Sequence, residues 1–162
     1  MNLLFLIPII SFLGILIGIF LKKIAKEEVK FGKFGSRYFI WMERAILLII
    51  ILTVLYFTEN ILIAALLAIV GFVVGIFLSE YLFLGVSIVF GFLKSNEILL
   101  LLSSLVFLYG LPFGSILRNI KIKHVLLVVL FFAPFFLLLF GINQDILIGF
   151  AAGGCFNYMI KR

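Results

Sequence analysis

The stretch ILIAALLAIVGFVVGIFLSEYLFLGVSIVFGFL, residues 61–93, decides how many times this chain would cross a membrane. Its single charged residue is Glu80. At a rise of about 1.5 Å per residue, Ile61–Leu78 is long enough to cross most of a hydrocarbon layer of about 30 Å, whereas Tyr81–Leu93 reaches only about 20 Å. The second half of the stretch is therefore either a short transmembrane helix or a re-entrant or interfacial segment.

The composition of the whole chain favours a membrane. Of the 162 residues, 66% are hydrophobic and 12% are charged, whereas soluble domains are about half apolar and about a quarter charged. A water-soluble fold of this length would leave much of its apolar surface in contact with water. We therefore expect an all-α, multi-pass integral protein of the cell membrane, with a single transmembrane domain over residues 1–162.

Apolar runs of about twenty residues, separated by charged, Asn or Gly residues, predict the transmembrane helices. Besides Ile61–Leu78, the clear runs are Leu3–Leu21, Phe39–Phe57, Ile98–Leu117, Val125–Ile142 and Ile146–Ile160. The first run lacks the basic segment and cleavage site of a signal peptide, so we interpret it as a retained helix. Each of the hairpins 58–60, 94–97 and 143–145 offers an Asn or Asp that can cap the following helix.

The basic residues decide between six and seven crossings, because they concentrate on the cytoplasmic side of membrane proteins. If Tyr81–Leu93 crosses, only Lys94 faces outward, and the other basic residues face the cytoplasm: Lys22, Lys23, Lys26, Lys30, Lys33, Arg37, Arg44, Arg118, Lys121, Lys123, Lys161 and Arg162. If Tyr81–Leu93 does not cross, five of these basic residues move to the outside: Arg118, Lys121, Lys123, Lys161 and Arg162. We therefore predict about seven transmembrane helices, with the N-terminus outside and the C-terminus in the cytoplasm.

The net charge of +6 is explained by this topology and by anionic lipid headgroups near the basic loop 22–38. The lipid bilayer is thus the expected partner, and nucleic acid is not. The loop is either a strip for lipid headgroups or a protein partner, or simply a solvated topology signal.

Two internal matches indicate a duplication. GILIGIFLKKI (Gly14–Ile24) aligns with GLPFGSILRNI (Gly110–Ile120), and ENILI (Glu59–Ile63) aligns with QDILI (Gln144–Ile148). They divide the chain into parallel units 1–79 and 95–162, joined by the short helix 81–93, a 3+1+3 plan. This architecture resembles that of the sugar transporters called SWEETs, without a shared sequence motif. Short matches also arise by chance in a chain so rich in Leu, Ile, Phe, Val and Gly.

A few polar residues inside apolar segments are candidates for function, since such residues are costly in a membrane. Glu80 is a candidate ion or proton site; the alternative is that it marks a turn in reach of water. Pro112 interrupts the backbone hydrogen bonds of its segment and marks a candidate substrate site. The substrate-binding candidates are Ser103, Ser104, Tyr109, Pro112 and Asn157.

Glycines spaced four residues apart allow helix backbones to approach closely. We interpret these pairs as helix-packing contacts rather than as the wall of a transport path. The residues are Gly14, Gly18, Gly71, Gly75, Gly110, Gly114, Gly149 and Gly153.

No motif predicts an enzyme, a metal site or a cofactor site. The small size, the broken helices and the minimal loops favour a small transporter or channel subunit for a small solute or ion, which would need a second copy to enclose a path. The alternative is a noncatalytic structural or assembly subunit of a larger membrane complex, which would bind other membrane subunits.

Overall fold

The computed structural model describes residues 6–25, 33–116 and 122–161. This part of the chain contains seven α-helices, one 3₁₀ helix and no strand. Residues 26–32 of the predicted basic loop, together with Arg118, Lys121 and Arg162, lie outside the described residues. The elements are α1 (Ile7–Ala25), α2 (Lys33–Tyr56), α3 (Ile61–Val74), α4 (Glu80–Lys94), α5 (Asn96–Ile116), α6 (Ile122–Phe132), η2 (Ala133–Phe140) and α7 (Gln144–Lys161).

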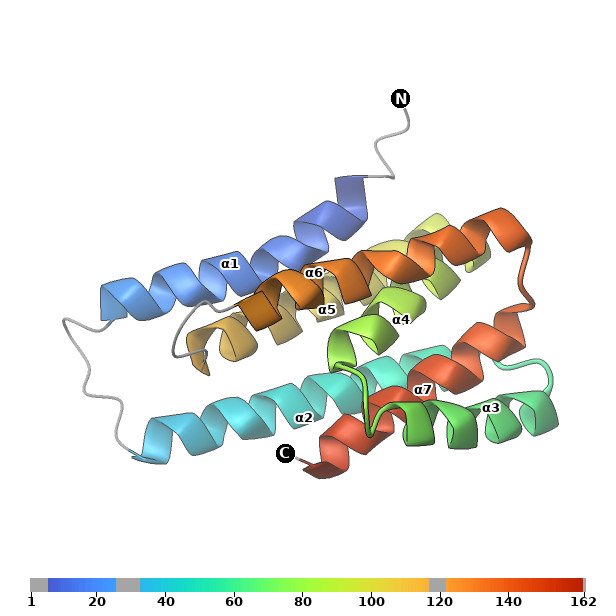
Figure 1. Ribbon diagram of the computed structural model, residues 1–162, viewed down its shortest axis with the longest axis horizontal. Helices are drawn as coiled ribbons and strands as arrows, with labels where there is room; N and C mark the ends of the chain where they lie inside the picture. Colours follow the sequence, from blue (N-terminus) through green and yellow to red (C-terminus); the bar gives the residue numbers. More distant parts are fainter. Residues whose placement is uncertain (1–5, 26–32, 117–121, 162) are drawn as a thin grey trace.

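The helices form a bundle in which each helix runs opposite to the one before it (Figure 1). Short turns join α3 to α4 and α4 to α5, and η2 continues α6 in the same direction before the chain turns back into α7. Helices α1, α3, α5 and α7 therefore run one way, and α2, α4 and α6 run the other. We refer to the two ends of the bundle as the Glu80 end and the Lys94 end, after the first and last residues of α4.

Two parallel pairs of helices pack with almost no space between their backbones. In the first pair, α1 lies on α5, and a Cβ atom added at Gly110 would lie 2.7 Å from the amide nitrogen of Ile15. A Cβ atom at Gly114 would meet the carbonyl of Ile15 and come within 3.1 Å of the Cα of Gly18. Only glycine permits this approach, because any side chain would separate the two helices.

The second parallel pair, α3 and α7, repeats this arrangement. Gly149 and Gly153 of α7 lie against the main chain of Ala64 and Ala68 of α3, and Gly71 lies against the main chain of Phe150. All eight glycines that the sequence singled out are thus in these two contacts. At Gly75, an added Cβ atom would lie 3.1 Å from the Cβ of Asn157.

Helix α4 occupies the centre of the bundle and contacts α5, α6, η2 and α7 (Figure 1). Its residues from Phe83 to Gly91 are all buried. Since other helices surround it, this short helix does not have to match the thickness of a lipid layer by itself. Its ends have local caps: Ser79 Oγ accepts from the amide of Tyr81 at 3.4 Å, and the amide of Ser95 donates to the carbonyl of Gly91 at 3.2 Å.

The helix ends differ from the sequence prediction in several places. Helices α1 and α2 extend into the predicted basic loop 22–38, because α1 continues to Ala25 and α2 begins at Lys33. Helix α3 ends at Val74, before the predicted Leu78, and turns lead from there to α4. The sixth run becomes a 3₁₀ helix at Ala133, because Pro134 lacks the amide that an α-helix would use. At the start of α5 the residue that caps is Ser95, whose Oγ accepts from the amide of Ile98 at 3.3 Å.

The predicted caps at the other two hairpins are confirmed. Asn60 is the N-cap of α3, and its side chain accepts from the amide of Ile63 at 3.3 Å. Asn143 Oδ1 accepts from the amide of Asp145 at the start of α7 at 2.9 Å.

The outer surface of the bundle is apolar. Large hydrophobic side chains are exposed along α1, α2, α3, α5, α6 and η2. By length and composition alone, two segments among the described helices could cross a membrane, Tyr38–Tyr56 and Asn96–Ser115, whereas Ile61–Val74 and Leu126–Phe140 are shorter apolar helices.

Candidate functional site

Glu80 lies in the first turn of α4, inside the bundle. The residue is only 6% exposed, and it directly follows the turns that lead from α3 into α4. Ser79 precedes it, and the Ser79 hydroxyl donates to Glu80 Oε2 at 3.2 Å. The partial positive charge at a helix N-terminus favours a carboxylate at this position.

The second oxygen of Glu80 faces α5. The hydroxyl of Tyr109 donates to Glu80 Oε1 at 3.5 Å, and Tyr109 is fully buried. The structure therefore brings together two of the predicted site residues, which lie in different apolar segments.

Aromatic rings close the space around this pair. The Tyr81 ring lies edge-on to Tyr109 with centroids 6.2 Å apart and to Phe113 with centroids 5.0 Å apart. The Tyr109 and Phe113 rings stack at 6.1 Å. Helix α7 contributes Cys155, which is buried within electrostatic range of Glu80. We call Glu80, Tyr81, Tyr109 and Phe113 the Glu80 cluster.

A second glutamate, Glu43 in α2, is also buried, although it was not among the predicted site residues. It is 0% exposed. Glu43 precedes Leu47, Ile50 and Val54 by four, seven and eleven residues and shares their buried face, but residues 45–52 are apolar on every side of the helix, so their spacing does not mark this face.

The remaining candidate residues lie elsewhere. Ser103 and Ser104 line a groove between α1 and α5, away from Tyr109. Pro112 lies inside α5 and cannot donate to the carbonyl of Leu108. The predicted grouping of the two serines with Tyr109 and Pro112 in one substrate site therefore does not occur as a single cavity among the described pockets.

Asn157 belongs to a contact between α7 and the end of α3. Its Nδ2 donates to the carbonyl of Phe72 at 3.0 Å. Nearby, Lys161 Nζ donates to the carbonyls of Gly75 and Ile76 at 3.3 and 3.2 Å, and the Tyr158 hydroxyl donates to the carbonyl of Leu78. These side chains satisfy carbonyls that the end of a helix leaves without amide partners, and they fix the turn that precedes Glu80.

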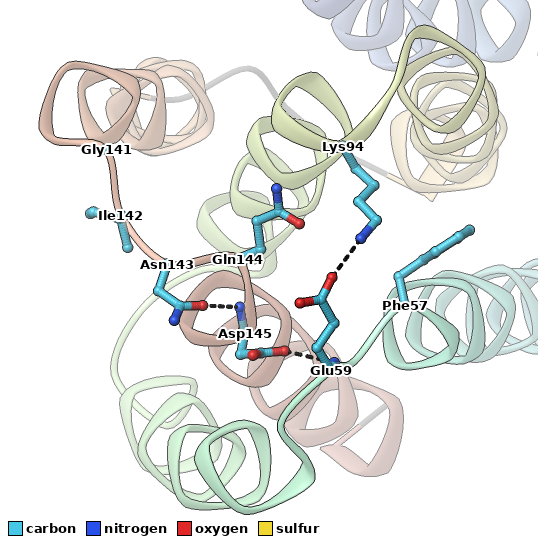
Figure 2. A pocket seen from close by; sticks show the side chains of 8 residues that line it. All are labelled: Phe57, Glu59, Lys94, Gly141, Ile142, Asn143, Gln144 and Asp145. Atoms are coloured by element: carbon cyan, nitrogen blue, oxygen red, sulfur yellow. Dashed lines mark hydrogen bonds and ion pairs between the residues drawn. The ribbon is translucent and has the colours of Figure 1, made fainter.

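A polar pocket of about 440 Å³ opens at the Lys94 end (Figure 2). Lys94 Nζ pairs with Glu59 Oε1 at 3.0 Å, and the two carboxylate oxygens of Asp145 accept from the amides of Glu59 and Asn60 at 3.0 and 3.2 Å. Asp145 thus joins the first turn of α7 to the two residues that precede α3. Gln144 and Asn143 complete the polar part of the wall.

Among the described residues, no three His, Cys, Asp or Glu side chains are grouped so that they could hold a metal ion. The chemistry available in the Glu80 cluster is therefore that of one carboxylate, its hydroxyl donors and an aromatic wall.

The fold and the site define a class: an all-helical bundle with an apolar exterior and a carboxylate buried in its interior. No protein-family model, no curated protein and no solved structure matches this chain. The comparison with SWEETs therefore stays an analogy of architecture, which carries no function by itself.

Proposed function

We propose that this protein is a seven-helix protein of the cell membrane, with its N-terminus outside. The apolar outer surface and the two long apolar helices support this placement. The helix directions also support it, because α1 and α5 run parallel, and parallel transmembrane helices must be separated by an odd number of crossings. Helices α2, α3 and α4 provide three crossings if the short α4 spans.

We further propose that the protein is a subunit of a small transporter for a proton or a monovalent cation. The observation that carries this proposal is the Glu80 carboxylate, buried at 6% exposure and bound by the Tyr109 hydroxyl. An ionisable side chain inside a membrane bundle is expensive to bury, so such residues usually mark an ion or proton pathway. In the proposed topology the Glu80 end faces the cytoplasm.

The packing of α4 favours a carrier over an open channel. Between Tyr81 and Lys94 the only hydroxyl on this helix is that of Ser87, and it donates to the carbonyl of Phe83 at 2.9 Å. The residues of α4 between the Glu80 cluster and the Lys94 end, Phe83 to Gly91, are all buried. We therefore propose that an ion crosses only after the helices rearrange.

The test is ion flux into liposomes that contain the purified protein, with proton, Na⁺ and K⁺ gradients applied in turn and each flux measured with a dye selective for that ion. We expect Glu80→Gln to abolish the flux, because the amide cannot exchange a proton or balance a cation. Tyr109→Phe removes one hydrogen bond and should change the rate by about two- to tenfold.

The matched control is Glu97→Gln, which neutralises an exposed glutamate in the first turn of α5. It should leave the flux unchanged. Equal flux in wild-type protein and Glu80→Gln would refute the role of Glu80, and wild-type flux no greater than that of empty liposomes would refute the transport proposal.

A second candidate function is a noncatalytic subunit of a larger membrane complex. The continuous packing around α4 favours it, since a structural subunit needs no path for an ion. Purification in mild detergent distinguishes the two: co-purification of stoichiometric membrane partners supports a structural subunit, whereas recovery of the chain alone, as a monomer or homodimer, counts against it.

A further inference from the structure

A groove of about 410 Å³ runs between α1 and α5 on the outside of the bundle. It lies in the half of the bundle nearest the Lys94 end, over the first turns of α1 and the middle of α5. Its wall is mostly hydrocarbon and includes Ile7 and Ser11 of α1 and Leu100, Ser103, Ser104 and Phe107 of α5.

The three hydroxyls in the wall are not equivalent. Ser11 Oγ donates to the carbonyl of Pro8 at 2.7 Å, and Ser104 Oγ donates to the carbonyl of Leu100 at 2.8 Å. Ser103 is 5% exposed, and its Oγ has no hydrogen-bond partner among the described residues. Leaving a buried hydroxyl unpaired costs free energy, so Ser103 is suited to a ligand that supplies an acceptor.

The surroundings of the groove restrict what that ligand is. Of the three hydroxyls in this groove, only that of Ser103 still has a proton to donate. The neighbouring surface is apolar, with Ile10 and Leu108 exposed beside the groove. A hydrocarbon chain that carries one hydrogen-bond acceptor satisfies both the apolar wall and the serine.

The depth of Ser103 agrees with a lipid. Ser103 lies seven residues along α5 from Asn96, which is about 10 Å of helix. The interfacial layer on each side of a bilayer is roughly 5–8 Å thick. In the topology proposed above, on which this inference rests, Ser103 lies just below the layer in which glycerol is linked to the lipid chains.

We propose that the groove binds one chain of a membrane glycerolipid from the outer leaflet, with the oxygen of its glycerol linkage accepting a hydrogen bond from Ser103 Oγ. The chain covers the parallel contact between α1 and α5. Lipid bound there would hold these two helices together from outside the bundle.

The test uses the protein in liposomes of phosphatidylcholine that carries a photoactivatable diazirine on one chain, followed by mapping of the labelled peptides by mass spectrometry. We expect labelling to concentrate on the two groove segments, 7–11 and 100–108. Ser103→Ala should lower labelling there by about two- to tenfold, the usual effect of one hydrogen bond. Leu100→Trp, which fills the groove, should lower it by at least as much.

Leu101→Trp is the matched control, because Leu100 is 53% and Leu101 49% exposed but only Leu100 lines the groove. It should leave groove labelling unchanged. Even labelling of all apolar helices, or equal effects of the two tryptophans, would overturn the inference and leave the membrane placement intact. If the groove is not labelled and Leu100→Trp disrupts a dimer of this protein, the groove would instead be the contact with a second copy of the chain. Absence of label from every peptide would contradict the membrane placement itself.

Discussion

Any side chain placed at Gly153 would collide with the neighbouring helix α3. A Cβ atom there would overlap the main chain of Ala68, which cannot move without displacing α3. We expect Gly153→Leu to lower the free energy of unfolding by about 1–3 kcal/mol or more, as overpacking does elsewhere. The measurement is the thermal unfolding temperature of the purified protein in detergent.

Ala65→Leu is the comparison for this substitution, because Ala65 lies on the exposed side of α3. It adds the same side chain without a steric conflict and should change stability by no more than about 0.5 kcal/mol. If both variants unfold at the same temperature, α3 and α7 do not pack as closely as the structure shows.

The two buried glutamates show what a sequence reveals about single residues. Glu80 stands out because it interrupts an apolar stretch, and its burial could be anticipated as one of two alternatives. Glu43 stands beside Arg44 and close to the basic loop, where charge is expected, so its sequence neighbours do not mark it as buried; only the structure shows that it shares a face with Leu47 and Ile50.

Among the elements, α4 decides the topology. Its fifteen residues span only about 22 Å, yet it runs antiparallel to α5, with Gly91 against Leu99 and Tyr81 against Phe113. In the proposed topology α4 is therefore the fourth crossing, and the helices packed around it compensate for its short length.

Cysteine labelling tests this crossing. In a Cys155→Ala background, we expect Ser95→Cys to react with a membrane-impermeant maleimide in intact cells and Ser79→Cys to react only after permeabilisation. The reason is that α4 lies between these two residues, so a spanning α4 places them on opposite sides of the membrane. Equal labelling of both residues, or of neither, would mean that α4 does not cross; the Cys155→Ala protein alone controls for background labelling.

The packing of the helix pairs also offers a second reason for the internal sequence matches. Gly14 and Gly110 were aligned as equivalent residues of two repeats, and they prove to lie against each other in a parallel contact, as do Gly18 and Gly114. Parallel helices in register need small residues at the same level. The glycine match therefore follows from the contact, with or without a duplication.

Across the whole molecule, α4 should be the most stable element. Helices cover it on several sides, so its amides exchange only when the bundle opens, whereas the peripheral α3 keeps one face exposed. We expect backbone amides of 83–91 to exchange with deuterium at least about tenfold more slowly than those of 61–74. Equal rates, measured by mass spectrometry of the protein in detergent, would contradict a central α4.

The sequence by itself determined the helical class, the approximate limits of the helices, the caps at Asn60 and Asn143 and the importance of the glycines. These properties depend on composition and on neighbouring residues, which are local. Only the tertiary structure decided that Tyr109 meets Glu80, that Glu43 faces inward and that Asn157 binds the end of α3. The physical reason is that these helices are apolar both on the face toward the core and on the outer face. Hydrophobic periodicity therefore does not reveal how a helix is rotated about its axis. That rotation determines which side chains meet.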